Sequence, residues 1–394
     1  MIYENNPFIK YTYNLLTLLD TIHINNNIKL LSLPYFKNFY YQFKNTYIYV
    51  YNNFFNVKTN NEYIIIKKEV YNVSNNNIKI NDFMSSDIIE KTKNLSYKYT
   101  FTFQKNIIYF ITNKILPLSI YIHNKTTNKI KDLLCLIETL KIIFQRQNFT
   151  QEITLFDLNI KKNLPIVKKF NKKNNTNMIL GPNNCNSGLT ELNNNYNGKI
   201  ILYRNEELIK VCIHELMHSN LIDTELIFSP ISKKFTEQFC FHYDVLMNEA
   251  YTECISVIIH SIYIGIKLNK KQEYINKLFN NEIKYSIYNA SKILHYYKIN
   301  SIYTIKKNNG ICNDYFNQTT NVFSYYFLKL ILFIKLKDLH NLLELYTEKF
   351  KINNSVMNNE LYNLFMNNIF LIDKYNLKLK KYNSSLRLTL YEIR

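Results

Sequence analysis

Two histidines and a glutamate in the stretch "VCIHELMHSN" (211–220) have the spacing of a metal-dependent hydrolytic centre. On a helix, His214 and His218 are four residues apart, so they project from one face and their ring nitrogens can converge on one ion. Zinc accepts imidazole nitrogen in tetrahedral sites at about 2.0 to 2.1 Å. Glu215 lies about 100° further round the helix, where a carboxylate can take a proton from a metal-activated water. The spacing therefore predicts two metal ligands and a general base.

The H-E-x-x-H pattern is informative but insufficient on its own, because it can also arise by chance. In 394 residues with 8 histidines and 30 acidic residues, a random H-E-x-x-H arises in on the order of one chain in a hundred. A zinc site also needs a third protein ligand.

A second stretch, "MNEAYTECISVIIHSIYIGI" (247–266), supplies candidates for that ligand. It is apolar almost all round, which predicts a buried helix, yet Glu249, Glu253, Ser256 and His260 form one polar stripe. Two carboxylates on a buried stripe repel each other and lose hydration, which is costly without a cation or donor nearby. We predict Glu249 as the third ligand and Glu253 as the acceptor that orients a ligating histidine. The alternative is a solvated stripe at a helix edge.

The two segments together resemble the gluzincin metallopeptidases, the thermolysin-like group. In that family H-E-x-x-H is joined by a glutamate from a downstream N-E-x-x-S/T-D/E segment, here "NEAYTE". The resemblance implies zinc held by His214, His218 and Glu249, with Glu215 as general base and Glu253 supporting a ligand.

The chain also departs from related zinc-peptidase patterns. The interval between His218 and Glu249 is longer than in thermolysin, which implies an insertion, and the metzincin motif H-E-x-x-H-x-x-G-x-x-H/D is not matched. Asp223 is an alternative third ligand that ranks below Glu249, and helix capping is its simpler interpretation.

A gluzincin also needs a donor, usually Tyr or His, that stabilises the oxyanion opposite the metal. The sequence offers several candidates and does not choose between them: His242, Tyr243, His260, His295 and Tyr325. Core packing is the default role of any one of the 34 tyrosines.

The elements that must position these residues predict an α+β fold. We expect a hairpin at 97–113, a backing helix at 127–146 and two further strands at 152–158 and 198–205. The active-site helix follows at 206–220, with Asn205 as its cap. The last 160 or so residues are mostly of helical pattern. This order is similar to that of the zincin lobe, which has a mixed sheet, a backing helix and an active-site helix. In that lobe the edge strand of the sheet pairs with extended peptide. The resemblance gives this role to "GKIILYRN" (198–205).

Three divisions of the chain follow from this pattern. Residues 1–92 are an accessory region of uncertain structure, 93–225 are the zincin lobe with H-E-x-x-H, and 226–394 are a helical lobe with the third ligand. Three of only five glycines, Gly181, Gly188 and Gly198, precede the H-E-x-x-H segment; they indicate either ordinary turns or a loop of close backbone approach that contacts substrate.

The composition limits the kinds of partner that can be expected for this chain. The net charge of +19 is spread along the chain rather than clustered, so no specific nucleic-acid surface is predicted. We expect no signal peptide and no membrane span, and the six cysteines lack paired spacing, which favours an intracellular location.

These observations predict an intracellular zinc-dependent metallopeptidase that acts on a peptide or protein. The alternative from another class is a catalytically inactive zincin-fold protein with a binding or structural role, in which the metal serves stability. The intact Glu215 favours the enzyme, because a structural site needs no base.

Overall fold

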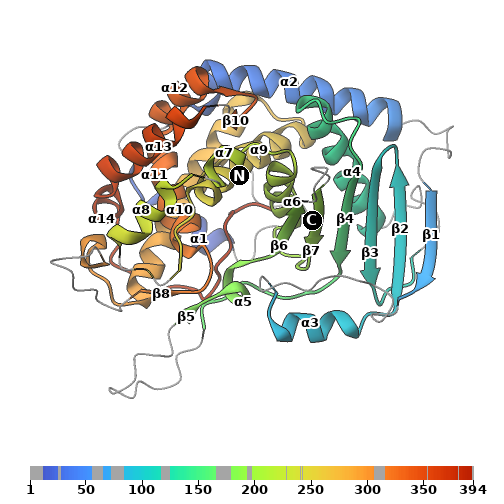
Figure 1. Cartoon of the computed structure of the whole chain (residues 1–394), viewed down its shortest axis with the longest axis horizontal. Helices are drawn as coiled ribbons and strands as arrows, with labels where there is room; N and C mark the ends of the chain where they lie inside the picture. Colours follow the sequence, from blue (N-terminus) through green and yellow to red (C-terminus); the bar gives the residue numbers. More distant parts are fainter. Residues whose placement is uncertain are drawn as a thin grey trace. The chain divides into compact units, whose positions relative to one another are not determined.

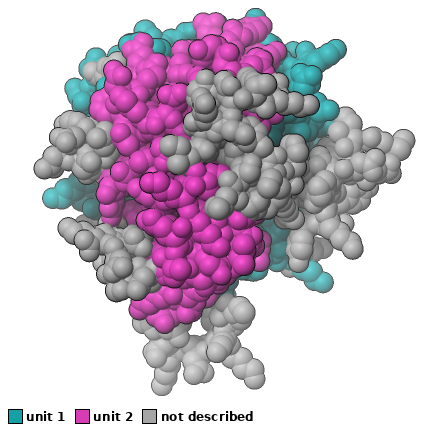
Figure 2. Space-filling view, turned by 90° about the vertical axis from the view of Figure 1, so that its right-hand side faces the viewer, with its two compact units in different colours: residues 1–37, 162–185, 223–394 teal, residues 38–161, 186–222 magenta. Residues whose placement is uncertain are grey.

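The structure is a computed structural model of the 394-residue chain. It describes thirteen parts of the chain: 12–24, 28–55, 65–71, 84–116, 125–165, 179–192, 198–227, 229–239, 241, 243–305, 316–352, 354–379 and 381–392. The chain divides into two compact units, coloured separately in Figure 2. Unit 1 contains residues 1–37, 162–185 and 223–394, and unit 2 contains 38–161 and 186–222.

Unit 2 is built on a six-stranded mixed sheet in the order β1-β2-β3-β4-β7-β6 (Figure 1). The pairs β1–β2, β2–β3 and β6–β7 are antiparallel, whereas β3–β4 and β4–β7 are parallel. The strands are β1 (Ile65–Val70), β2 (Tyr97–Phe103), β3 (Asn106–Thr112), β4 (Gln151–Phe156), β6 (Gly188–Leu192) and β7 (Gly198–Leu202). Its helices are α3 (Ser86–Lys93), α4 (Lys125–Ile143), α6 (Leu208–Ser219), the π-turn η2 (Tyr51–Phe55) and residues 38–50 of α2 (Pro34–Val50).

Alternation along the strands explains how both faces of this sheet are covered. Leu202 faces α6, and its neighbour Ile201 packs in a cluster with Ile88 of α3. Since successive strand residues point to opposite faces, α3 and α6 lie on opposite sides of the sheet. Helix α4 contacts both β3 and α6, so the predicted backing helix lies beside the helix that carries His214.

One detail of the predicted strands is corrected. The hairpin, the 152–158 strand and the 198–205 strand are confirmed, but 198–205 is not an edge strand, because β7 pairs with β4 on one side and β6 on the other. Among the described strands the edge next to α6 is β6. The stretch "LSIYIH" (118–123), whose pattern also predicts a strand, lies outside the described residues.

Unit 1 is mostly helical. Its central helices are α9 (Met247–Lys267), α10 (Gln272–Tyr296), the π-turn η6 (Ser324–Leu328) and α11 (Lys329–Ile334), with contacts between α9 and α10, α9 and η6, and α10 and α11. Around them lie α1 (Thr12–Asp20), η1 (Leu30–Ser32), α5 (Pro182–Cys185), α7 (Thr224–Ile227), α8 (Ile231–Gln238), η5 (Ile302–Ile305), α12 (Leu336–Tyr346), α13 (Ser355–Asn368), α14 (Leu371–Lys374) and two short two-stranded sheets, β5 (Ile179–Leu180) with β8 (Asn317–Gln318) and β9 (Thr347–Glu348) with β10 (Lys351–Ile352). The α+β class with a helical C-terminal part is therefore confirmed.

Residues from distant parts of the sequence close unit 1. The amide oxygen of Asn276 accepts from the backbone N–H of Leu31, and that of Asn280 accepts from Ile28. The Tyr35 hydroxyl accepts a hydrogen bond from the Phe350 backbone N–H at 2.6 Å, across 315 residues of sequence. Contacts of this kind tie residues 28–35 to the helical core.

No helix in the described parts of the chain has the length and apolar character needed to cross a membrane.

Candidate metal centre

Helix α6 carries both predicted histidine ligands. His214 is buried and His218 is half-buried, and their Nε2 atoms face each other at 3.1 Å. Two nitrogens bound to one zinc at tetrahedral angles would be about 3.3 Å apart, given bond lengths of about 2.05 Å. The two imidazoles thus already have the spacing that a shared ion requires.

The carboxylate of Glu215 lies on the same helix and is held from strand β6. The Thr190 hydroxyl is 2.8 Å from Glu215 Oε2 and 3.0 Å from the Glu215 carbonyl oxygen. Glu215 is only 5% exposed, so this contact replaces water at one carboxylate oxygen. A carboxylate that is buried and held in one orientation would suit general base catalysis.

Two of the clustered glycines allow α6 to approach the sheet. A Cβ on Gly188 would lie 3.1 Å from Glu215 Cγ and 2.8 Å from Leu202 Cδ2, and a Cβ on Gly198 would lie 2.4 Å from Ser219 Oγ. Close backbone approach, rather than a left-handed turn, is therefore the reason for glycine at these positions. Ser219 also donates to Gln151 of β4 at 2.6 Å, which fixes the end of α6.

The start of α6 differs from the prediction. Asn205 is not its cap, because its side-chain amide donates to Asp157 Oδ1 at 2.6 Å. The helix begins after Glu207, whose φ is 59°, in the left-handed region. Such a conformation is uncommon outside glycine, asparagine and aspartate, and it gives the chain a sharp turn between β7 and α6.

Glu249 lies in the first turn of α9, where the helix dipole favours a carboxylate. The Tyr325 hydroxyl, from the π-turn η6, donates to Glu249 Oε2 at 3.0 Å. The charge of Glu249 also acts on Tyr243: burial first, and this carboxylate second, raise the pKa of the Tyr243 phenol. Glu249 is half-buried and has one oxygen fixed by a donor.

His214, His218 and Glu249 form a group that can hold a metal ion. Each offers one ligand atom, and these three atoms lie within 4.8 Å of one another. Two imidazoles and one carboxylate are a ligand set that zinc accepts, with a fourth position left for water or substrate. The third-ligand prediction thus agrees with this arrangement, whereas the identity of the ion stays a prediction.

The buried stripe on α9 has a charged partner on α11 that the sequence analysis did not predict. Glu253 is completely buried, and its Oε1 is 3.5 Å from the ammonium of Lys329, which is 1% exposed. Tyr325 and Lys329 are four residues apart on one continuous helical segment. Tyr325 contacts Glu249, and Lys329 contacts Glu253 four residues further along α9. A protein cation therefore compensates Glu253, and its predicted role in orienting a histidine stays a prediction.

The other candidates lie in different surroundings. His295 is exposed near the end of α10, where its ring packs edge-on against Tyr382. His242 lies outside the described residues. Asp223 is fully buried and accepts hydrogen bonds from two α9 side chains, Asn248 at 3.1 Å and Thr252 at 3.2 Å. Of the donor candidates, Tyr325 is brought to Glu249, to which its hydroxyl donates.

Thr190 and Lys329 are the site residues that sequence reasoning missed. Thr190 gave no signal, since a threonine in a strand is ordinary. Lys329 did give one, because it is a single lysine within the apolar helical run "NVFSYYFLKLILF". A lysine on a buried face requires an acidic partner or a carbonyl oxygen.

Comparison with known proteins gives little further guidance. The chain matches no protein-family model and no solved structure. An uncharacterized protein of Acanthamoeba polyphaga mimivirus is 30% identical over 120 residues, which is 29% of this chain. The matched stretch spans 30% of the length of that viral protein.

Proposed function

We propose that this chain is a zinc-dependent metallopeptidase of gluzincin type that acts on peptides or proteins inside the cell. The observation that carries the proposal is the group of His214, His218 and Glu249, with ligand atoms within 4.8 Å of one another and a buried carboxylate, Glu215, beside the two histidines on α6. A structural metal site would have no use for that carboxylate.

A zinc ion held by these residues would supply Lewis-acid polarisation of the scissile carbonyl and would activate water. Glu215 takes the proton from the attacking water and returns it to the leaving amine. Thr190 holds one oxygen of Glu215 and so helps to orient this carboxylate. Tyr325 orients Glu249.

Strand β6, an edge of the sheet among the described strands, is the element that would bind the substrate. An extended peptide can pair with the open edge of a sheet through its backbone, and β6 carries Thr190, which contacts the general base. Peptide added there would lie beside Glu215. This transfers to β6 the role that the sequence had given to residues 198–205.

The buried thiols of Cys212 and Cys254 are free, which supports the intracellular location.

The test measures zinc content and peptidase activity on the same preparations. We expect Glu215→Gln to keep stoichiometric zinc and lose turnover, since the amide cannot accept the proton, and His218→Ala to lose zinc. His295→Ala is the matched control, because this exposed histidine lies near the end of α10 against Tyr382, and it should keep both properties. Wild-type protein without zinc would refute the proposal, and full zinc without hydrolysis of a diverse peptide library would favour the binding or structural protein.

A further inference from the structure

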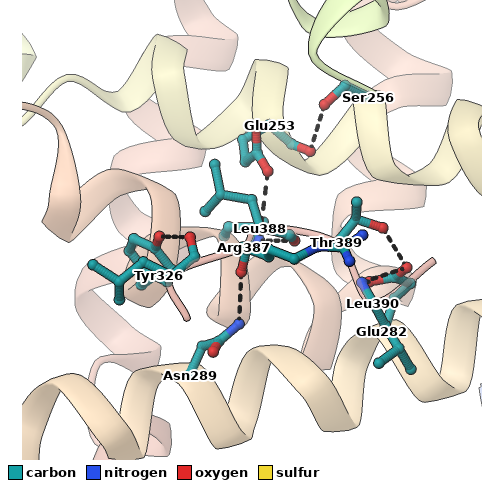
Figure 3. Close-up of polar contacts among 11 residues, drawn as sticks. Glu253, Ser256, Glu282, Asn289, Tyr326, Arg387, Leu388, Thr389 and Leu390 are labelled. Atoms are coloured by element: carbon teal, nitrogen blue, oxygen red, sulfur yellow. Dashed lines mark hydrogen bonds and ion pairs between the residues drawn. The ribbon is translucent and has the colours of Figure 1, made fainter. Parts of the chain in front are cut away.

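Side chains of buried helices in unit 1 bind the backbone of residues 383–391. Figure 3 shows Arg387, Leu388, Thr389 and Leu390 of this stretch. Successive carbonyl oxygens accept from different donors: Ser385 from Lys292, Leu386 from Tyr326, Arg387 from Asn289 and Leu388 from Lys329. The backbone N–H groups of Leu390 and Tyr391 then donate to Glu282. We call this stretch the 383–391 segment.

The segment is an integral part of the core. Leu386 and Thr389 are completely buried, and Leu388 is 4% exposed. Buried backbone groups that lack a helix or sheet ladder need side-chain partners, and five buried polar side chains of α10, η6 and α11 supply them. These partners are costly to bury, so their convergence on one stretch of backbone is a specific binding arrangement.

One donor of this arrangement and the neighbour of another contact the carboxylates of α9. Lys329 donates to the Leu388 carbonyl oxygen at 3.1 Å and lies 3.5 Å from Glu253, so one ammonium joins the segment to α9. Tyr326 binds the segment, while its neighbour Tyr325 donates to Glu249. The π-turn that contains both tyrosines is a local departure from α-helix of a kind often found at functional sites.

We infer that the 383–391 segment positions the metal-ligand face of α9: it fixes the 324–329 helical turn, and that turn sets Glu249 through Tyr325 and Glu253 through Lys329. Tyr326, Asn289 and Lys329 are positioning residues in this scheme. The inference rests on the proposed function, because it assigns Glu249 to a metal ion.

The experiment uses the full chain with neutral substitutions that loosen the segment without touching α9. Tyr326→Phe removes the hydroxyl bound to Leu386, and Tyr326→Phe combined with Asn289→Leu removes two successive backbone contacts. Tyr297→Phe is the matched control, since it deletes an equivalent tyrosine hydroxyl that donates to the carbonyl oxygen of Asn317, away from the segment. Hydrogen exchange of peptides that cover 383–391 reports docking, and competition with a chromophoric chelator reports zinc affinity.

We expect faster exchange in the segment and a zinc affinity reduced about tenfold in the double variant, the lower end of the range for partners that support ligands. The single Tyr326→Phe variant, which is less prone to unfold, should change both properties in the same direction by less, and Tyr297→Phe should change neither. Faster exchange with unchanged zinc affinity would overturn this inference and leave the metallopeptidase proposal standing. Wild-type protein that binds no zinc would overturn both.

Discussion

Replacing Thr190 by valine tests whether strand β6 orients the general base. Valine has nearly the shape of threonine, so the substitution removes the hydroxyl at 2.8 Å from Glu215 Oε2 and leaves the packing of the strand almost unchanged. A hydrogen bond to a charged group contributes about 1.5 to 3 kcal/mol, and each 1.4 kcal/mol of lost transition-state stabilisation is a factor of about ten in rate. We therefore expect kcat of Thr190→Val to fall about ten- to a hundredfold.

The assay is steady-state peptide hydrolysis together with zinc content by elemental analysis. Zinc content should not change, because Thr190 is not in the ligand group. Thr190→Ser keeps the hydroxyl and is the control for the loss of a methyl group, so it should retain most of the wild-type kcat. Equal kcat in the valine and serine variants would refute the assigned role, and loss of zinc in Thr190→Val would mean that Thr190 maintains the fold of the site rather than its base.

Two further predictions concern packing and pH. Gly188→Ala should lower kcat and destabilise unit 2 by about 1 to 3 kcal/mol, because the new methyl group would lie 3.0 Å from the Ile201 carbonyl oxygen as well as against Glu215; unfolding in urea checks it, and a variant with wild-type stability would contradict it. Burial raises the pKa of Glu282 to about 7 from 4.5. A carboxyl whose pKa is higher in the folded state stabilises fully below its unfolded value and loses that contribution as pH rises through about 7, here on the order of 3 kcal/mol. The free energy of unfolding of the wild-type protein should thus decrease between pH 4.5 and 7 more steeply than that of Glu282→Gln, and parallel curves would refute the assignment.

The site residues on helices were predictable because their spacing is local. His214, Glu215 and His218 are neighbours on one helix in any fold that keeps α6. The polar residues of α9 are recognisable because nearly all other residues of this helix are apolar. The sequence could also exclude the metzincin motif by inspection. It could not show that Glu253 meets Lys329, since that contact joins helices 76 residues apart and depends on how they pack.

Strand order was the less predictable part of the fold. Strand β6 has only five residues, and the pattern of so short a strand does not show which strands it pairs with. For this reason the sequence predicts an edge position for β7, which in fact pairs on both sides. The Asn205 cap failed for a related reason. A side chain that suits a helix cap also suits a tertiary hydrogen bond, and the carboxylate of Asp157, 48 residues away, proved to be its partner.

The hydrogen bond between the Tyr35 hydroxyl and the Phe350 backbone N–H bears on how fast unit 1 can fold. Closing a loop of 315 residues costs on the order of 5 kcal/mol of chain entropy before the contacts that it brings together can compensate. The strands of unit 2 come from two nearer stretches, 38–161 and 186–222, and can pair without that closure. Folding that depends on such distant contacts is slow, so we expect unit 2 to form its sheet first and the helix with Glu249 to reach its final surroundings later.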